Sequence, residues 1–313
     1  LEFQKGIQGN KIRITLDTEI QKLSAKLLLN KAGSISVMDI YTGDIIAMYS
    51  SPSYDPNLFL FGISQDEWEL IRNNPLKPLI HKTISGLYSP GSTIKPIVAL
   101  SALENNIINP NFKVKCTGKT ELYGQTFHCW KEKGHGFVSL KNAMKQSCDT
   151  YFYEVSRLLG VDRLNITAKK FGLGEKVLGE YFDNEKKGLF PNTKWKKNNL
   201  GKGWVLGETL ITGIGQGYTQ TTPLQLCLMT AQIANGGYKI KPKILVNSNP
   251  LSFEQAKNSM ELQSLHSTNT KLFKDHKNIK LVQEAMFSST NEIYGTSYKS
   301  RIDDPKYQFA GKT

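Results

Sequence analysis

One four-residue pattern in the chain, Ser92-Thr93-Ile94-Lys95, has the residue types and spacing of a serine nucleophile with its base. Positions i and i+3 of a helix share a face, so the Lys95 amine can reach the Ser92 hydroxyl. A buried lysine of lowered pKa can accept the serine proton and so activate the hydroxyl. Backbone N–H groups at the helix N-terminus can stabilise a developing oxyanion. The structural alternative makes Ser92 an N-cap and Lys95 a surface residue.

The residues around Ser92 favour the nucleophile. Tyr88-Ser-Pro-Gly91 strongly favours a turn, and the helix expected from Ser92 to Asn105 contains Pro96. Proline is tolerated there only if the helix starts close to Ser92, because in the first turn it removes at most one hydrogen bond. Ser92 is therefore predicted to lie at a sharp junction between a loop and a helix.

A second pattern brings three of the four cysteines together with a histidine, as Cys116-x12-Cys129-x5-His135-x12-Cys148. Three thiolates and an imidazole suit a closed tetrahedral zinc site of the structural kind. The spacing is not that of a finger with two C-x-x-C pairs, so a disulfide and ordinary buried thiols remain alternatives. His128 is a possible substitute for His135, although adjacent residues rarely both bind a metal.

The elements that must position these groups alternate between helices and strands. Two apolar-rich runs around Thr42-Gly43-Asp44 indicate a β-hairpin over 34–49. Apolar spacing, capping residues and turn residues predict helices at 10–30, 66–73, 92–105, 140–159 and 222–234, loops at 52–91 and 180–210, and a strand or turn entry at 309–313. The mixture predicts an α+β fold with strands at both ends of the chain. Cys227 lies among apolar residues and is expected in the core.

Composition excludes few functions. Hydrophobic content of 39% and charged content of 21% are ordinary for a soluble globular protein. The sequence contains no apolar run of about 18 residues, so it predicts no membrane span, and its start has no signal-peptide pattern. The net charge of +13 favours anionic partners, or is simply a solvated basic surface. The sequence shows no nucleic-acid-binding motif, so nucleic acid is not expected as a partner.

The chain also resembles a known family. Penicillin-recognising enzymes combine S-x-x-K with an S-x-N-like triplet and a K-T-G triplet. Ser147-Cys148-Asp149 and then Lys312-Thr313 follow Ser92 in that order. Longer stretches resemble the elongation-type penicillin-binding protein 2 group, namely Ser53-Tyr-Asp-Pro-Asn57, Ser89-Pro-Gly-Ser-Thr-Ile-Lys-Pro96, Ser147-Cys-Asp-Thr-Tyr-Phe-Tyr153 and Gly213-Ile-Gly-Gln-Gly-Tyr-Thr-Gln-Thr-Thr-Pro-Leu-Gln225. The resemblance runs from Gly9 to Thr313 and implies a class B penicillin-binding protein, a peptidoglycan D,D-transpeptidase.

The resemblance implies a role for each motif residue. Ser92 would attack the D-Ala–D-Ala bond of a donor stem peptide with Lys95 as base, and Ser147 would pass the proton to the leaving D-Ala. Lys312 and Thr313 would bind the terminal carboxylate of the substrate. An acceptor amine from a second peptide would then resolve the acyl-enzyme. β-Lactams, which mimic D-Ala–D-Ala, would leave Ser92 acylated.

The Ser147-Cys148-Asp149 triplet carries two further implications. Asp149 stands where other members have Asn; an S-x-D form is common in this subfamily. Members of the group carry a zinc site with one ligand between the two polar residues of this triplet, which is the position of Cys148. The resemblance therefore favours Zn²⁺ at Cys116, Cys129, His135 and Cys148, and predicts that the metal fixes the position of Ser147.

The resemblance also implies an architecture and a location. The expected fold is that of the penicillin-binding serine transpeptidases: an antiparallel sheet packed with helices, plus an all-helical subdomain. Residues 1–9 would be the remnant of a link to an N-terminal pedestal domain. Residues 10–313 would be a transpeptidase domain that stops at the K-T-G motif, without the last strands. The full protein would work on the periplasmic face of the bacterial inner membrane, anchored there, beside a glycosyltransferase of the elongation machinery.

Other functions on the same fold remain open. A D,D-carboxypeptidase differs mainly in the acceptor that reaches the acyl group, and a β-lactam-sensing module acylates without turnover. A serine β-lactamase needs an activated water, for which the residues near Ser92 provide no clear base. A degenerate scaffold would not need Ser92, Lys95, Ser147 and Lys312, and these four are intact.

Overall fold

The computed structural model describes residues 9, 11–179, 182–246 and 270–313. Residues 1–8 of the expected link lie outside the described residues. The α-helices are α1 (Thr18–Leu27), α2 (Gln65–Asn73), α3 (Lys82–Ser85), α4 (Lys95–Glu104), α5 (Leu140–Lys145), α6 (Asp149–Leu159), α7 (Val161–Lys170), α8 (Thr193–Leu200), α9 (Leu206–Gly213), α10 (Pro223–Ala234) and α12 (His276–Asn291). The strands are β1 (Gly33–Met38), β2 (Ile45–Ser51), β3 (Lys113–Cys116), β4 (Lys119–Leu122), β5 (Gln125–His128) and β6 (Gly136–Ser139). Short 3₁₀ helices cover Pro56–Phe59, Gly91–Ile94, Tyr298–Ser300 and Pro305–Tyr307.

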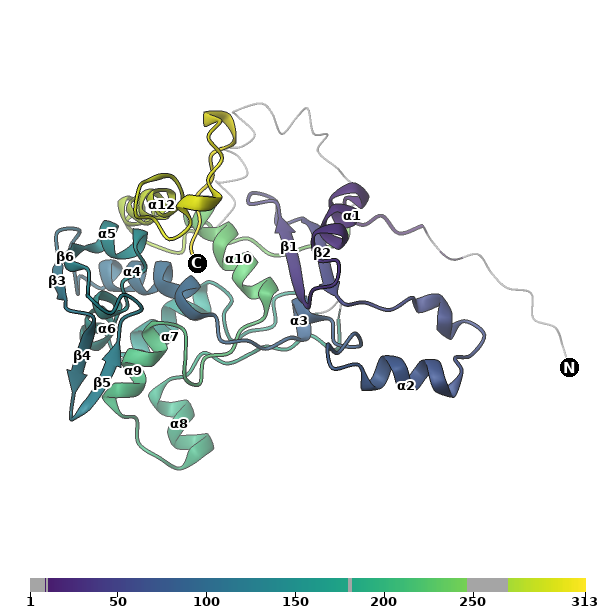
Figure 1. The fold of residues 1–313 in the computed structure, drawn as a ribbon, viewed down its shortest axis with the longest axis horizontal. Helices are drawn as coiled ribbons and strands as arrows, with labels where there is room; N and C mark the ends of the chain where they lie inside the picture. Colours follow the sequence, from purple (N-terminus) through teal and green to yellow (C-terminus); the bar gives the residue numbers. More distant parts are fainter. Residues whose placement is uncertain (1–8, 10, 180–181, 247–269) are drawn as a thin grey trace, which may run out of the picture.

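Most of the helices gather in one body, and the strand pair β1–β2 lies beside it together with α1, α2 and α3 (Figure 1). The helices α4, α5, α6, α7, α9 and α12 surround the larger core, and the short ladders β3–β6 and β4–β5 lie at its outer edge. A smaller core joins β1, β2 and α3 to α10, which lies between the two parts. The segment that contains α2 projects from the side of β1 and β2. The mixed α+β architecture is as predicted.

The predicted β-hairpin is confirmed, and the helix predicted within 10–30 is present but shorter, as α1 at Thr18–Leu27. Strands β1 and β2 pair antiparallel, with Ser36 opposite Met48 and a bulge between Val37 and Met38. The Asp17 carboxylate accepts hydrogen bonds from two backbone N–H groups in the first turn of α1, which is how an N-cap residue stabilises a helix. Gln21 of α1 exchanges two side-chain hydrogen bonds with the backbone of Met48, so α1 packs on β2.

Three expectations from sequence are wrong in detail. The single helix predicted over 140–159 is two helices, α5 and α6, separated by three residues that include Ser147. The predicted loop over 180–210 contains α8 and the start of α9. At 309–313 the chain forms no strand pairing among the described residues; instead, the Gly311 N–H donates to Met286 O on α12 at 3.2 Å. Within the described ranges, no helix is both long enough and apolar enough to span a membrane.

Candidate active site and metal centre

Ser92 lies in the first turn of a composite helix. The 3₁₀ helix Gly91–Ile94 runs directly into α4, and Pro96 occupies the first turn of α4, where it is tolerated. Side chains three residues apart share a face in both 3₁₀ and α-helical geometry, so Ser92 and Lys95 lie on one face of the composite helix. Ser92 is half-buried and lines a cleft of about 990 Å³ together with Ser147 and Asp149. The turn and the helix therefore present the hydroxyl to the cleft.

Lys95 is fully buried and bonded to the second motif rather than to Ser92. Its Nζ donates to Asp149 Oδ1 at 2.7 Å, to Ser147 O at 2.9 Å and to Ser147 Oγ at 3.2 Å. Among the described residues, no hydrogen bond joins Lys95 to the Ser92 side chain. Burial lowers the pKa of Lys95, and the Asp149 carboxylate offsets part of that change. A lysine in this environment is closer to being a base than one in water.

Ser147 occupies a strained position between two helices. Its φ of 53° is left-handed, a conformation that costs a non-glycine residue free energy. Its carbonyl and hydroxyl both accept from Lys95, and its hydroxyl also accepts from Lys312 Nζ at 2.8 Å. The break between α5 and α6 thus turns one serine towards two amines. Strain of this kind persists where the surroundings over-determine it, as in active sites.

The end of the chain lies against this group. Burial and the nearby Lys95 charge lower the pKa of Lys312 to about 7, while Asp149 opposes the change. Thr313 lines the cleft, and its hydroxyl donates to Thr296 Oγ1 at 2.9 Å. Four of the residues singled out from sequence therefore line one cleft, namely Ser92, Ser147, Asp149 and Thr313, and the amines of Lys95 and Lys312 both donate to the Ser147 hydroxyl.

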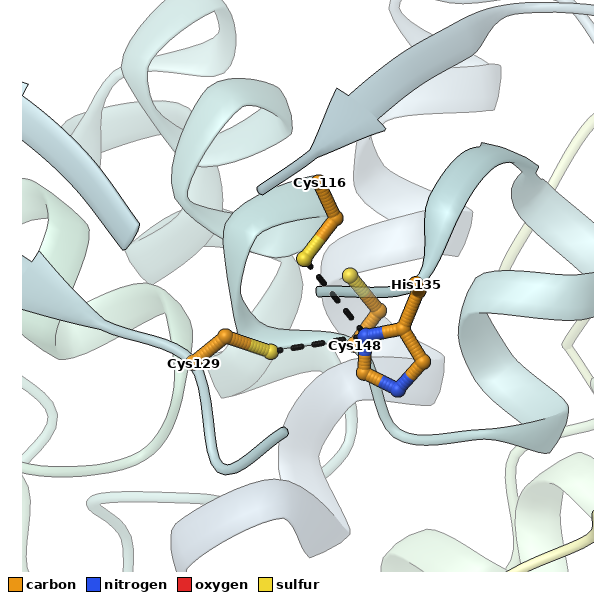
Figure 2. A group of neighbouring side chains, drawn as sticks. All are labelled: Cys116, Cys129, His135 and Cys148. Carbon is orange, nitrogen blue, oxygen red and sulfur yellow. Dashed lines mark hydrogen bonds between the residues drawn. The ribbon is translucent and has the colours of Figure 1, made fainter. Parts of the chain in front are cut away.

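Sheet register brings the four predicted metal ligands together. Cys116 ends β3 and pairs with Gly136 of β6, which places it beside His135. The β4–β5 hairpin returns the chain so that Cys129 N donates to Gly118 O at 2.8 Å. Cys148 is the N-cap residue of α6. The four ligand atoms lie within 4.8 Å of one another, and three of the side chains are buried (Figure 2).

The donor set fits a tetrahedral zinc ion. His135 Nδ1 lies 3.5 Å from Cys116 Sγ and 3.6 Å from Cys129 Sγ, as Figure 2 shows. Ligands at zinc bond lengths of about 2.0–2.3 Å are separated by roughly 3.3–3.8 Å in a tetrahedron, so only small movements are needed. A hydrogen bond with Cys148 lowers the pKa of Cys129 to about 4, and that thiolate raises the pKa of Cys148. A cation would relieve this competition, because it favours the thiolate form of every cysteine bound to it.

The geometry also bears on two alternatives left open by spacing, the disulfide and the choice of histidine. All four cysteines are free thiols, so the disulfide alternative is not observed. The histidine of the cluster is His135; His128 lines the active-site cleft instead. Cys227 is half-buried against the smaller core, and burial raises its pKa to about 11. His135 Nδ1 is the ring nitrogen directed at the thiols, and Nε2 is buried without a hydrogen-bond partner among the described residues.

Sequence reasoning missed several residues of the site. Trp130, Gln216, Tyr294 and Thr296 line the cleft. Trp130 follows Cys129 directly and contacts the second motif, as described below. Gln216 lies in the glycine-rich stretch 213–217, whose repeated glycines were the available signal for close backbone packing. No pattern marked Thr296, because it belongs to an irregular segment after α12.

Comparison with known proteins agrees with this site. Residues 33–313 match the penicillin binding protein transpeptidase domain. The chain is 35% identical over 308 residues to the peptidoglycan D,D-transpeptidase MrdA of Acinetobacter baumannii, covering 98% of this chain and 44% of that protein. It is 32% identical to MrdA of Escherichia coli K12, covering 97% of this chain and 47% of that protein. The chain thus spans about half the length of the curated relatives it matches.

Solved structures show the same relationship. Pseudomonas aeruginosa PBP2, solved in complex with WCK 5153, matches with a TM-score of 0.83 and 36% identity, over 94% of this chain and 62% of that one. Helicobacter pylori PBP2, solved in complex with MreC, matches with a TM-score of 0.83 and 32% identity, over 93% of this chain and 52% of that one. With motifs, fold and matched length in agreement, the chain belongs to the family of penicillin-binding protein transpeptidase domains.

Proposed function

We propose that the chain is the catalytic part of a peptidoglycan D,D-transpeptidase of the elongation type, which cross-links stem peptides through a serine acyl-enzyme and is inhibited by β-lactams. The observation that carries the proposal is the convergence of Lys95 and Lys312 on Ser147 at the cleft that Ser92 lines. Relatives named peptidoglycan D,D-transpeptidase support it over nearly the whole chain.

We assign a step to each group. Lys95 accepts the Ser92 proton as Ser92 Oγ bonds to the carbonyl carbon of the penultimate D-Ala. The C–N bond to the terminal D-Ala then breaks, and Ser147 donates its proton to the leaving amine while Lys95 returns one to Ser147, since Lys95 Nζ is 3.2 Å from Ser147 Oγ. The reverse sequence, with an acceptor amine as attacking group, forms the new amide and frees Ser92. In its protonated form Lys312 attracts the substrate carboxylate, and Thr313 donates a hydrogen bond to it.

We propose that a structural zinc ion is bound by Cys116, Cys129, His135 and Cys148. The support is the convergence of the four ligand atoms and the chemistry of the donor set. When bound, zinc would supply a rigid crosslink between the 116–135 segment and the start of α6. Because Cys148 lies between Ser147 and Asp149, that crosslink would hold both residues facing Lys95.

The cellular setting is proposed by analogy. MrdA relatives support action on peptidoglycan, and hence on the outer, periplasmic face of the inner membrane. The complex between Helicobacter pylori PBP2 and MreC supports assembly with the elongation machinery. We propose that a glycosyltransferase is a further partner and that the protein is anchored in the membrane, in both cases through residues outside the described ranges.

The test is covalent labelling of the full-length protein with a penicillin, read by intact mass, beside Ser92→Ala. Stoichiometric, long-lived label that disappears in Ser92→Ala supports the proposal. Rapid loss of the label indicates a β-lactamase, and no label on folded protein indicates a non-catalytic scaffold. Stem peptides then separate the remaining functions: a cross-linked dimer indicates transpeptidation, release of D-Ala alone a carboxypeptidase, and no turnover a sensor.

A further inference from the structure

Trp130 connects the cysteine and histidine cluster to the catalytic motif through three hydrogen bonds. Its backbone N–H donates to Asp149 Oδ2 at 3.0 Å. Its indole Nε1–H is shared between Ser147 O at 3.1 Å and Gln146 O at 3.0 Å. The indole ring also meets the His135 ring edge to face, with centroids 5.4 Å apart.

The groups that Trp130 holds are those that hold Lys95. Lys95 Nζ donates to Asp149 Oδ1, and Trp130 N donates to the other oxygen of that carboxylate. Lys95 Nζ also donates to Ser147 O, which is an acceptor of the Trp130 indole. Two of the three groups that accept from the Lys95 amine therefore also accept a hydrogen bond from Trp130. The Asp149 carboxylate accepts from its backbone N–H, and the Ser147 carbonyl accepts from its indole N–H.

Ser147 needs such support more than most residues do. Its left-handed φ of 53° is strained for a serine, and its carbonyl lies in the turn between α5 and α6. The indole N–H donates to the carbonyl oxygens of both Gln146 and Ser147, which stabilises this turn in its strained conformation. Trp130 itself is 58% exposed, so burial of its ring does not account for its position.

We propose that Trp130 is a positioning residue for acylation, whose indole N–H fixes the Ser147 turn and thereby the acceptors that orient the Lys95 amine. This inference rests on the proposed serine acyl-enzyme function. Trp130 follows Cys129 in the chain and contacts His135, so the position of the cysteine and histidine cluster determines where Trp130 holds the acceptors of Lys95. Among the described residues, its hydrogen bonds to the catalytic motifs go to Ser147 and Asp149.

The experiment removes the indole N–H and keeps the ring. Trp130→Phe does this approximately, and site-specific replacement of Trp130 by benzothienylalanine, an isostere with sulfur in place of N–H, does it with little change in shape. Trp204→Phe is the matched control, since Trp204 Nε1 donates to Thr209 Oγ1 at 2.8 Å and neither residue lines the active-site cleft. Each full-length protein is titrated with a penicillin to separate the non-covalent dissociation constant from the limiting acylation rate.

We expect both Trp130 variants to lower the limiting acylation rate roughly tenfold, about the effect of one neutral hydrogen bond, without changing the dissociation constant. Trp204→Phe should leave the rate unchanged. A higher dissociation constant at an unchanged rate would make Trp130 a ligand contact and overturn the proposal. A lower Tm with both constants unchanged would reduce it to a structural residue and overturn it equally.

A second readout keeps this inference separate from the proposed function. If the wild-type protein takes no label, the proposed function fails. Crystal structures of wild type and the isostere variant still test the positioning role, through the distances from Lys95 Nζ to Ser147 and Asp149. Lengthening or loss of these contacts in the variant supports the role of Trp130, and unchanged contacts contradict it.

Discussion

Gly91 and Gly215 meet backbone to backbone directly beside the nucleophile, where the Gly91 N–H donates to Gly215 O at 2.9 Å. Gly215 has φ of +74°, and a Cβ placed on it would overlap the backbone of Gly91. The turn that precedes Ser92 therefore rests on a position where the chain has no room for a side chain. This contact gives the glycine-rich stretch after α9 a physical role in setting the direction of the Ser92 hydroxyl.

Gly215→Ala should displace the Ser92 turn. We expect loss of penicillin labelling by at least about tenfold, because displacement of a nucleophile by an ångström costs more than that in rate. The control is Gly201→Ala, since Gly201 has a similar φ of +64° but open space around it. Gly201→Ala bears only the backbone cost of about 1 kcal/mol and should label normally. Equal labelling of the two variants would contradict the proposed contact.

Two substitutions at Ser147 separate its hydroxyl from its backbone strain. Ser147→Ala and Ser147→Gly both remove the oxygen that accepts from Lys95 and Lys312, so both should slow acylation by roughly 10²–10⁴-fold, the usual contribution of general acid–base catalysis. Glycine adopts φ of 53° without strain, so Ser147→Gly should be more stable than Ser147→Ala by about 1 kcal/mol. Chemical denaturation measures that difference, and greater stability of the alanine variant would show that the turn is not strained.

The sequence alone marks the candidate active-site residues because their chemistry is tied to local spacing. Ser92 and Lys95 are three residues apart on one helix, so their proximity follows from helix geometry alone. The cluster of Cys116, Cys129, His135 and Cys148 was predicted from residue types, and strand register then brings the four together. The roles of all these residues, the zinc ion and the domain boundaries stay predictions.

The tertiary contacts could not be predicted in this way. The helix expected over 140–159 breaks because Ser147 is held by Lys95 and Lys312, which lie 52 and 165 residues away in sequence. Apolar periodicity continues through the break and gives no sign of it. Trp130 is part of the site through its backbone N–H as well as its indole, and a backbone contact leaves no signal in residue type.

Loss of the proposed zinc should destabilise the chain and slow acylation together. We expect one zinc per chain in wild type by mass spectrometry of metals, and little in His135→Ala or Cys116→Ser. Cys227→Ser is the matched control, because that cysteine lies outside the cluster and should keep both metal and labelling rate. Wild-type protein that contains no zinc after expression in zinc-supplemented medium would falsify the proposal. Chelated, zinc-free protein with an unchanged acylation rate would contradict the link to Ser147.

The stability of the fold should depend on pH through Glu292, whose carboxylate connects the end of α12 to lysines of α5. Its carboxylate accepts from Ser288 Oγ at 2.8 Å and lies 3.0 Å from both Lys141 and Lys145. The Ser288 hydrogen bond, followed by Lys145, lowers the pKa of Glu292 from 4.5 to about 2. The unfolded chain therefore takes up this proton first as the pH falls. The contribution of Glu292 to stability is complete above pH 4.5 and is lost between pH 4.5 and about 2.

Glu292→Gln should accordingly lower the Tm by a few degrees at pH 7 and have little effect near pH 2, so thermal melts of the variant and wild type should converge as the pH falls. The effect is modest because the carboxylate is 40% exposed and water screens its ion pairs. Ser288→Ala tests the cause, since it keeps the carboxylate but removes the hydrogen bond that lowers its pKa most. In that variant the acid-induced loss of stability should still begin near pH 4.5, the value of the unfolded chain, but it should be complete at a higher pH than in wild type and be smaller. A Tm difference between Glu292→Gln and wild type that is the same at pH 7 and pH 2 would show that the charge of Glu292 does not stabilise the fold.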